Sequence, residues 1–402
     1  PSATGSFDFS IKGSRYTVLV PLTRGRHLAY HTVSRAFSVW EGRDHALWCA
    51  LGRAGTLQFD ADFREFVQGG YVVNAEVDER EEVRHAYEAA RQNDTSMMFT
   101  IAPTLSCNFA CAYCFQGLEK PVTRMSSKVR DATKAFLRDR LDGLRSLRET
   151  WYGGEPLMDQ ASIWDISKDV IGHCDAMDIQ YSAMMITNGY HLTLPVAKRL
   201  AEVRVGKVQI TIDGDAASHD ARRHLVSGRG TFDRIISNIK AVAEQGLMQI
   251  LVRVNLDGDN EPQAAGLLGA LQAEGLGVQN GVSVYFAPVE SVAEAAGATG
   301  CEGCFSKTEY AEAENRLSAQ AFEKGLMGVP KMPRFMGLCT AVKPNSYVVV
   351  PNGDLHKCWD TVMDRTKRVG TVTGSRTRSD AGTEILWNGW SPFDNHVCTD
   401  CM

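Results

Sequence analysis

The sequence predicts an α/β protein whose central domain is built on a parallel sheet. Six apolar, β-branched runs lie between residues 97 and 287, and segments of helical periodicity separate them. Alternating strands and helices form parallel sheets with helical crossovers. Polar and glycine-rich motifs follow several of these runs, at the strand ends where such sheets carry their functional loops. Six of the eleven cysteines fall after residue 300, which predicts a different kind of domain there.

The expected elements divide the chain into three domains, 1–98, 99–300 and 301–402. The central strands are predicted at 97–103, 149–152, 182–187, 207–213, 249–255 and 282–287, with helices at 128–147, 231–245 and 262–274. The first domain shows strand-like runs at 16–20 and 27–33 and helical segments near 44–52, 60–68 and 78–92, which indicates a small α+β module. The last has a helix near 306–325 and a strand at 347–350 in Gly-, Pro- and Cys-rich sequence. We expect metal to replace the core that this last domain is too small to build.

Composition excludes several classes of function. The net charge is −5 and no basic run occurs, so nucleic acid is not an expected partner. No apolar stretch approaches the roughly 20 residues that span a bilayer, so no membrane partner is expected. The segment from Pro1 to Phe9 lacks the apolar core of a signal peptide, and we therefore expect a cytoplasmic protein.

Clustered cysteines in a reducing compartment indicate metal or catalysis rather than disulfides. Nine of the eleven cysteines are clustered, and Cys49 and Cys174 stand alone, where we interpret them as core residues. Cys107, Cys111 and Cys114 follow the first central strand with three and two residues between them. Three thiolates on one loop can bind a cuboidal iron–sulfur cluster and leave one iron without a protein ligand, as in centres built for chemistry. The alternative is a zinc site, although zinc usually takes four ligands from CxxC pairs.

This CxxxCxxC loop resembles the signature of the radical S-adenosylmethionine (SAM) superfamily. The resemblance implies a partial (β/α)6 TIM-like barrel and a [4Fe–4S] cluster whose open iron chelates the amino and carboxylate groups of SAM. It also implies reductive cleavage of SAM to a 5′-deoxyadenosyl radical that abstracts a hydrogen atom from substrate, with electrons from a flavodoxin- or ferredoxin-type donor. Tyr113, which precedes the last cysteine, would lie near the adenine.

Motifs at later strand ends are similar to the family's SAM-binding residues. Gly153, Gly154 and Glu155 resemble the GGE motif, in which glycines allow close backbone approach and the carboxylate accepts hydrogen bonds from the SAM ammonium. The resemblance further implies that Thr211 contacts the ribose and that Arg223 pairs with the SAM carboxylate. An adenine contact is implied at the end of the sixth strand, at Phe286. The alternatives are a capping or ion-pair role for Thr211 and Arg223, and core packing for Phe286.

The C-terminal cysteines resemble the start of a SPASM domain, which holds one or two auxiliary iron–sulfur clusters. Cys339 and Cys358 flank a glycine at the family spacing, and Cys398 and Cys401 form a following CxxC. Because the sequence stops after that pair, the remaining SPASM cysteines are missing, and we expect the full protein to continue. Cys301 and Cys304 would complete a four-thiolate set with Cys339 and Cys358. The alternative is a zinc ribbon that joins 301/304 to 398/401, or a pair of reactive thiols.

Asp360 is a candidate proton acceptor. In sulfatase-maturing relatives a carboxylate soon after this cysteine has that role, although Asp360 is offset by one residue from their pattern. A solvated surface carboxylate is the alternative interpretation.

Three functional hypotheses follow from the resemblance. The first is a maturase that abstracts a hydrogen atom from a ribosomally made precursor peptide, leading to a crosslink or another backbone or side-chain change. In that case the N-terminal module, whose element order resembles winged-helix precursor-recognition elements, would bind the leader peptide by strand addition; a purely structural cap is the alternative. The second is an anaerobic sulfatase-type maturase that forms formylglycine. The third, from another class, is a non-catalytic zinc-binding adaptor.

Overall fold

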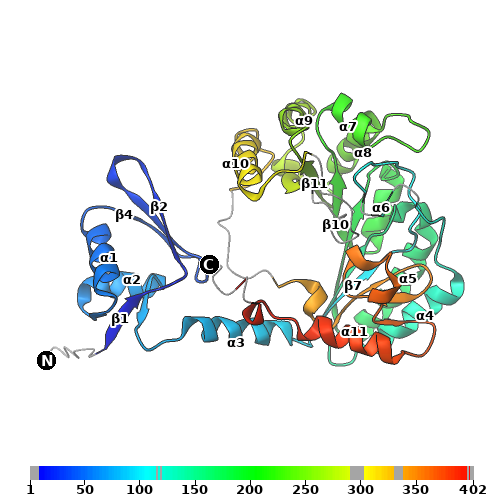
Figure 1. Ribbon diagram of the computed structural model, residues 1–402. Coiled ribbons are helices and arrows are strands. Elements are labelled where there is room, and N and C mark those ends of the chain that lie inside the picture. Colours follow the sequence, from blue (N-terminus) through cyan, green and yellow to red (C-terminus); the bar gives the residue numbers. More distant parts are fainter. Residues whose placement is uncertain are drawn as a thin grey trace. The chain divides into compact units, whose positions relative to one another are not determined.

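The computed structural model describes residues 9–114, 116–117, 120–289, 303–329, 338–395 and 398 (Figure 1). These residues form two compact units. The N-terminal unit contains residues 9–93, 338–339, 390–395 and 398, and the sheet unit contains the described residues of 94–329 together with 340–389. Among the described residues, no helix is both long enough and apolar enough to cross a membrane.

The sheet unit is built on one nine-stranded sheet with the order β12-β11-β10-β9-β8-β7-β13-β14-β15. The strands are β7 (Ser96–Ile101), β8 (Ser146–Trp151), β9 (Gln180–Thr187), β10 (Val205–Thr211), β11 (Gln249–Leu256), β12 (Val282–Pro288), β13 (Ser346–Val349), β14 (Asp354–His356) and β15 (Gly370–Thr371). Strands β7 to β12 are parallel and neighbour one another in chain order. This parallel α/β sheet confirms the predicted fold class, while the described strands form no closed barrel.

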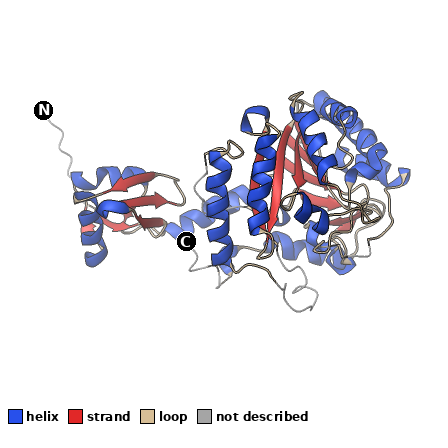
Figure 2. Cartoon of the chain, turned by 90° about the horizontal axis from the view of Figure 1, so that it is seen from above, coloured by secondary structure: helices blue, strands red, loops and turns tan. Residues whose placement is uncertain are grey.

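Helices connect the parallel strands and flank the sheet (Figure 2). They are α4 (Ser127–Arg138), α5 (Gln160–Ala176), α6 (Leu194–Glu202), α7 (Ala216–Arg222), α8 (Phe232–Ala243), α9 (Glu261–Ala273), α10 (Lys307–Glu323) and α11 (Arg378–Gly389), with short 3-10 turns at η3 (Pro156–Asp159), η4 (Val278–Asn280), η6 (Thr340–Val342), η7 (Trp359–Thr361) and η8 (Arg365–Lys367). Branched aliphatic side chains of the strands and helices form one core, in which Ile163, Leu200, Ile239 and Leu267 are completely buried. Cys174 belongs to this core, as the sequence predicts.

The described residues after 301 do not form a unit of their own, because those of 303–329 and 340–389 belong to the sheet unit. Strand β13 pairs in parallel with β7, with Tyr347 opposite Phe99, and β14 and β15 extend the sheet in antiparallel fashion. Helix α10 packs against α9 and β12. The physical reason is that β7 begins the parallel series and would otherwise present an unpaired backbone edge, which β13 covers.

The N-terminal unit is an α+β structure with two three-stranded antiparallel sheets, ordered β5-β1-β6 and β2-β3-β4. Its elements are β1 (Ser10–Gly13), β2 (Thr17–Pro21), η1 (Thr23–Gly25), β3 (His27–His31), β4 (Phe37–Trp40), α1 (Arg43–Ala54), β5 (Leu57–Gln58), η2 (Ala61–Phe63), α2 (Arg64–Gly69), β6 (Val72–Asn74) and α3 (Glu79–Arg91), with η9 (Pro392–Asp394) from the end of the chain. Aromatic residues dominate its core, where Trp40 packs against Trp48, Phe66 and Tyr71.

Candidate cofactor site at the strand ends

The three cysteines of the predicted cluster loop line one cavity of about 400 Å³. Cys107, Cys111 and Cys114 follow the carboxyl end of β7, and the other walls come from the ends of β8 to β12 and from the turn after β14. Because the carboxyl ends of parallel strands lie at one edge of the sheet, motifs far apart in the sequence meet there. The structure therefore brings most of the predicted site residues to one place.

Two glycines after β8 pack against the backbone that leads into the cysteine loop. Gly153 has φ +124°, and a Cβ atom there would lie 2.4 Å from Thr104 O. A Cβ at Gly154 would lie 2.2 Å from Ser106 O. Because no Cβ atom intervenes, Gly154 N donates a hydrogen bond to Thr104 O at 3.0 Å. Both glycines also line the cavity, so their lack of a side chain allows close packing of the cysteine loop and close approach of a ligand.

Glu155 lies behind the cavity wall, and its predicted contact with the SAM ammonium stays a prediction. Its side chain is completely buried and does not belong to the cavity lining. The carboxylate accepts hydrogen bonds from Leu157 N at 3.0 Å, Thr187 Oγ1 at 2.8 Å and Asn188 N at 2.8 Å. Burial raises the pKa of Glu155, and these three hydrogen bonds oppose that rise. In this structure the carboxylate ties the end of β8 to the end of β9.

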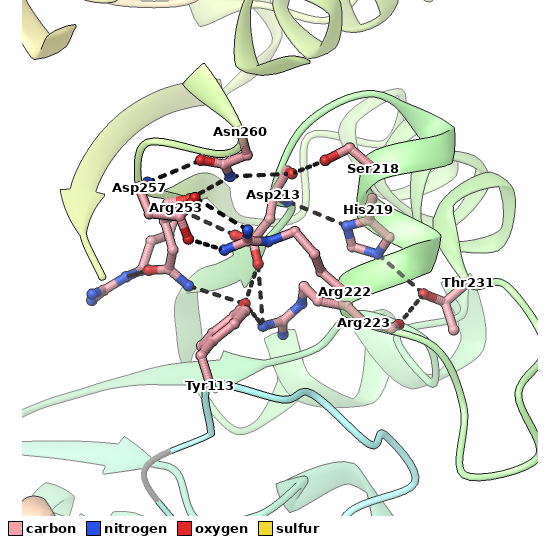
Figure 3. Close-up of polar contacts among 11 residues, drawn as sticks. Tyr113, Asp213, Ser218, His219, Arg222, Arg223, Thr231, Arg253, Asp257 and Asn260 are labelled. Atoms are coloured by element: carbon pink, nitrogen blue, oxygen red, sulfur yellow. Dashed lines mark hydrogen bonds and ion pairs between the residues drawn. The ribbon is translucent and has the colours of Figure 1, made fainter. Parts of the chain in front are cut away.

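Tyr113 and Arg223 meet at a buried carboxylate, that of Asp213 (Figure 3). The Tyr113 hydroxyl donates to Asp213 Oδ2 and accepts from Arg223 Nη1 at 2.5 Å and from Asn255 Nδ2 at 3.3 Å. Arg223 Nη1 lies 3.8 Å from the same Asp213 oxygen. Burial raises the pKa of Tyr113, so the phenol stays protonated at neutral pH. Both side chains line the cavity and are bonded to each other, while their predicted contacts with SAM stay predictions.

The buried side chain of His219 forms hydrogen bonds with residues next to this group. His219 Nδ1 accepts from Asp213 N at 3.3 Å, and His219 Nε2 lies 3.0 Å from Thr231 Oγ1. Since the Thr231 hydroxyl donates to Arg223 O at 2.8 Å, it accepts from His219, which fixes the tautomer with the proton on Nε2. Burial, together with the nearby Arg223 charge, lowers the pKa of His219 to about 3. The neutral ring thus holds the backbone amide of Asp213 directly and the backbone carbonyl of Arg223 through Thr231.

Thr211 lines the cavity, whereas Phe286 does not. Side chains alternate between the two faces of a strand. Tyr285 pairs with Arg253, which pairs with Thr211, so these three share the face of the cavity. Phe286 points the other way and is buried in the hydrophobic core. The predicted adenine contact at Phe286 stays a prediction, and Pro288 and Val289 supply the apolar wall from this strand end.

The turn after β14 brings Trp359 and Asp360 to the cavity. Cys358 Sγ lies 3.6 Å from Asp360 Oδ2, and the Trp359 ring lies 5.3 Å from the ring of Tyr152. The location of Asp360 agrees with its candidacy as a proton acceptor. The pattern of residues alone gave no reason to expect Tyr152 and Trp359 as neighbours.

The remaining predicted ligands are only partly described. Cys301 and Cys401 lie outside the described residues, and Cys304 is disulfide-bonded. Cys339 is exposed and Cys398 is half-buried, both in the N-terminal unit. Auxiliary cluster binding by these cysteines and Cys358 stays a prediction.

The cavity has the donor set that a cluster needs. Burial raises the pKa of Cys107 to about 11, so its thiol is neutral unless a cation stabilises the thiolate. The amide nitrogen Nε2 of Gln116, in the cavity wall, is buried without a hydrogen-bond partner among the described residues. No three described Cys, His or acidic side chains are grouped to bind a single ion, as zinc requires. A cuboidal cluster presents a separate iron to each thiolate, which suits three thiols spread around one wall.

Sequence reasoning missed several residues of this site. Asp213 stands two residues after Thr211 in a strand-end motif, and its position alone could have identified it. Arg253 is a charge on a β-branched, apolar strand, which is also a recognisable signal. Gln116 and Asn188 carry no signal beyond their closeness to the motifs.

A parallel sheet with three cysteines on the loop after its first strand defines an α/β protein built to hold an iron–sulfur cofactor. Residues 101–268 match the family model of the Radical SAM superfamily. This part of the chain is a radical SAM domain.

Curated relatives match part of the chain, and solved structures share its fold. The mycofactocin maturase MftC of Mycobacterium tuberculosis (strain CDC 1551 / Oshkosh) is 27% identical over 173 residues, which cover 42% of this chain and 40% of the relative. The chain thus matches less than half of the length of that relative. The structure of native anSMEcpe with bound AdoMet covers 72% of this chain and 84% of its own, with a TM-score of 0.57 and 14% identity. Streptococcus suis SuiB bound to precursor peptide SuiA covers 97% and 93%, with a TM-score of 0.54 and 13% identity.

Proposed function

We propose that this protein is a radical SAM enzyme that modifies a ribosomally made precursor peptide. The observation that carries the proposal is the convergence of Cys107, Cys111 and Cys114 with the ends of the five strands β8 to β12 on one cavity of about 400 Å³. A cavity at the carboxyl edge of a parallel sheet is the usual place for chemistry in this fold class. The arrangement suits a cluster ligated on one side and open to a small molecule on the other.

Each group of cavity residues would have its own role. The three thiolates hold the cluster, which, when bound with SAM and reduced, supplies a carbon radical able to abstract a hydrogen atom. The Gly153–Gly154 backbone and Thr211 line the place of the SAM molecule. Arg223 offers its charge for the SAM carboxylate, and Tyr113 and Asp213 hold the guanidinium in position. Glu155 acts through β9 by fixing Asn188 and Thr187.

A peptide substrate is supported by the names of similar proteins. One is a mycofactocin maturase, and SuiB was solved with its precursor peptide. We propose that the N-terminal unit binds the leader of the precursor, because it has antiparallel sheets with edge strands that can accept a further strand. Electrons would come from a flavodoxin- or ferredoxin-type donor, and the protein would work in the cytoplasm.

Further cysteines and one carboxylate belong to the proposal. Cys339, Cys358, Cys398 and Cys401, with Cys301 and Cys304, would ligate one or two auxiliary clusters; Cys304 would do so only after reduction of its disulfide. Asp360 would accept a proton from the substrate at the cavity wall, where the structure has its side chain. Retention of full turnover in Asp360→Asn would remove this role.

The proposal is tested with anaerobically reconstituted protein. Incubation with SAM and a strong reductant should release 5′-deoxyadenosine, and Cys107→Ala should abolish the release and lower the iron content. Cys49→Ala is the matched control, because Cys49 lies in the N-terminal unit and does not line the cavity. Zinc in place of iron and acid-labile sulfide would instead support the adaptor hypothesis.

The substrate class is tested by mass spectrometry. Peptides translated from small reading frames beside the gene should change mass with wild-type protein and not with Cys107→Ala. Conversion of a sulfatase-derived peptide to its formylglycine form, with no change in the precursor candidates, would favour the sulfatase-type maturase.

A further inference from the structure

Among the described residues that line the cavity, three have cationic side chains. Lys120 Nζ donates to Phe109 O at 2.7 Å. Arg223 is bonded to Tyr113 and lies beside Asp213. Arg253 Nε donates to Asn255 Oδ1 at 2.7 Å, and within the described ranges its guanidinium forms no ion pair with a carboxylate. Among the described lining residues, Lys120 and Arg253 thus form no ion pair, and only Arg253 presents two adjacent N–H groups, on its terminal nitrogens, without a hydrogen-bond partner.

Neighbouring side chains hold Arg253 in a defined orientation. The Asn255 amide that accepts from its Nε also donates to the Tyr113 hydroxyl. On the other side, Arg253 Cζ lies 6.0 Å from the centroid of the Tyr285 ring, and the Tyr285 hydroxyl donates to Gln209 Oε1 at 2.9 Å. In Figure 3 the guanidinium points away from the group of Tyr113, Asp213 and Arg223. A flexible surface arginine would lack these constraints.

We infer that Arg253 binds a carboxylate of the substrate, a step that rests on the proposed function. A guanidinium fixed through Nε keeps its two-nitrogen edge free for the two oxygens of a carboxylate. Asp360 is the one acidic side chain among the described lining residues, so an incoming anion meets little repulsion. Because the proposed function assigns Arg223 to the carboxylate of SAM, the two terminal nitrogens of Arg253 are available to bind the substrate. The carboxylate comes from an Asp or Glu side chain or from a peptide C-terminus.

The test measures binding without turnover. Reconstituted holoprotein saturated with SAM is incubated with three pools of random octapeptides, and bound peptides are quantified by mass spectrometry. The first pool carries one Glu and is acetylated and amidated, the second has Gln in its place, and the third has Gln with a free C-terminal carboxylate. Wild-type protein should enrich the first or the third pool over the second by about tenfold, as expected for one charge-assisted pair.

Variants assign the enrichment to Arg253. Arg253→Gln should abolish it, Arg253→Lys should retain part of it, and Arg204→Gln should leave it unchanged. Arg204 is the matched control because its ion pair with Asp175 is exposed and outside the cavity lining. Equal binding of all three pools, or undiminished enrichment in Arg253→Gln, would overturn the inference.

Two further measurements separate this inference from its alternatives. The affinity of Arg253→Gln for SAM should equal that of wild type, and a loss of about tenfold or more would assign Arg253 to the cofactor instead. Failure of wild-type protein to release 5′-deoxyadenosine would count against the proposed function, whereas the peptide selection would still report on Arg253.

Discussion

Glu155 shows how one side chain can support a cavity that it does not line. Its carboxylate is completely buried and accepts three hydrogen bonds from the first residues of η3 and the end of β9. Its predicted contact with the SAM ammonium stays a prediction, while its hydrogen bonds align the ends of β8 and β9. A buried carboxylate that satisfies three donors cannot be removed without leaving those donors unpaired.

We therefore expect Glu155→Ala to destabilise the protein by about 2–4 kcal/mol. The affinity for SAM should fall as well, while the iron content stays intact, because the bond from Glu155 N to Ser106 O is made by the backbone. Guanidinium unfolding and SAM binding measure the two effects. Glu274→Ala, which removes an exposed ion pair with Lys240, is the control and should change stability by about 0.5 kcal/mol or less. Unchanged stability of the Glu155→Ala variant would contradict the structural role.

The conformation of the cysteine loop depends on the element beside it. The turn after β8 approaches the backbone of Thr104 and Ser106 so closely that neither Gly153 nor Gly154 has room for a Cβ atom. The spacing of the cysteines says nothing of this contact. Since the loop must present three thiolates to one cluster, its backbone support is part of the site.

Gly154→Ala should therefore lower the iron content after reconstitution and destabilise the protein by more than about 2 kcal/mol, because its Cβ would lie 2.2 Å from a carbonyl oxygen. Gly172→Ala is the matched control. Gly172 lies inside α5 with open space around its Cβ position, so alanine should stabilise the protein by up to about 1 kcal/mol. Iron analysis and thermal unfolding of both variants decide the matter. Equal iron in the two would show that the contact does not shape the loop.

At the scale of elements, strong periodicity was enough to predict the sheet. All six central strands and the helices α8, α9 and α10 occur close to the predicted ranges, because their buried faces repeat with a clear period, whereas α5 had no predicted range. Helix α4 ends at Arg138 rather than near 147, since a turn with Gly143 at φ +76° follows. The short strands β1 and β4 to β6 were missed, because two to four residues give too little alternation to recognise.

At the scale of the whole molecule, the site motifs were predictable and the domain division was not. Each motif lies at a strand end, so the parallel topology alone brings Cys107, Gly153 and Thr211 together. Recruitment of β13 to the edge of β7 depends on long-range pairing, which no local pattern encodes. Phe286 illustrates the same limit, because a shift of one residue along a strand exchanges the cavity face for the core.

The stability of the molecule should also depend on pH through one carboxyl group outside the site. Glu149 on β8 is completely buried and accepts from the Tyr181 hydroxyl at 2.5 Å. Burial raises its pKa from 4.5 to about 7, against the opposing effect of that hydrogen bond. Its other titratable neighbour, Cys174 on α5, has its pKa raised to about 11, so both neighbours are neutral across this range.

A raised pKa in the folded state means that the folded protein binds the proton more tightly than the unfolded chain. The contribution of Glu149 to stability is therefore full below pH 4.5 and is lost as the pH rises through about 7. The loss amounts to about 3 kcal/mol at 1.36 kcal/mol per pH unit. Glu149→Gln should remove this dependence, and urea unfolding at pH 5 and pH 8 measures it. Subtracting the variant from wild type cancels the opposing contribution of His219 and His356, whose pKa values are lowered by burial. If wild type and variant lose the same free energy of unfolding between pH 5 and pH 8, ionisation of Glu149 does not destabilise the folded protein.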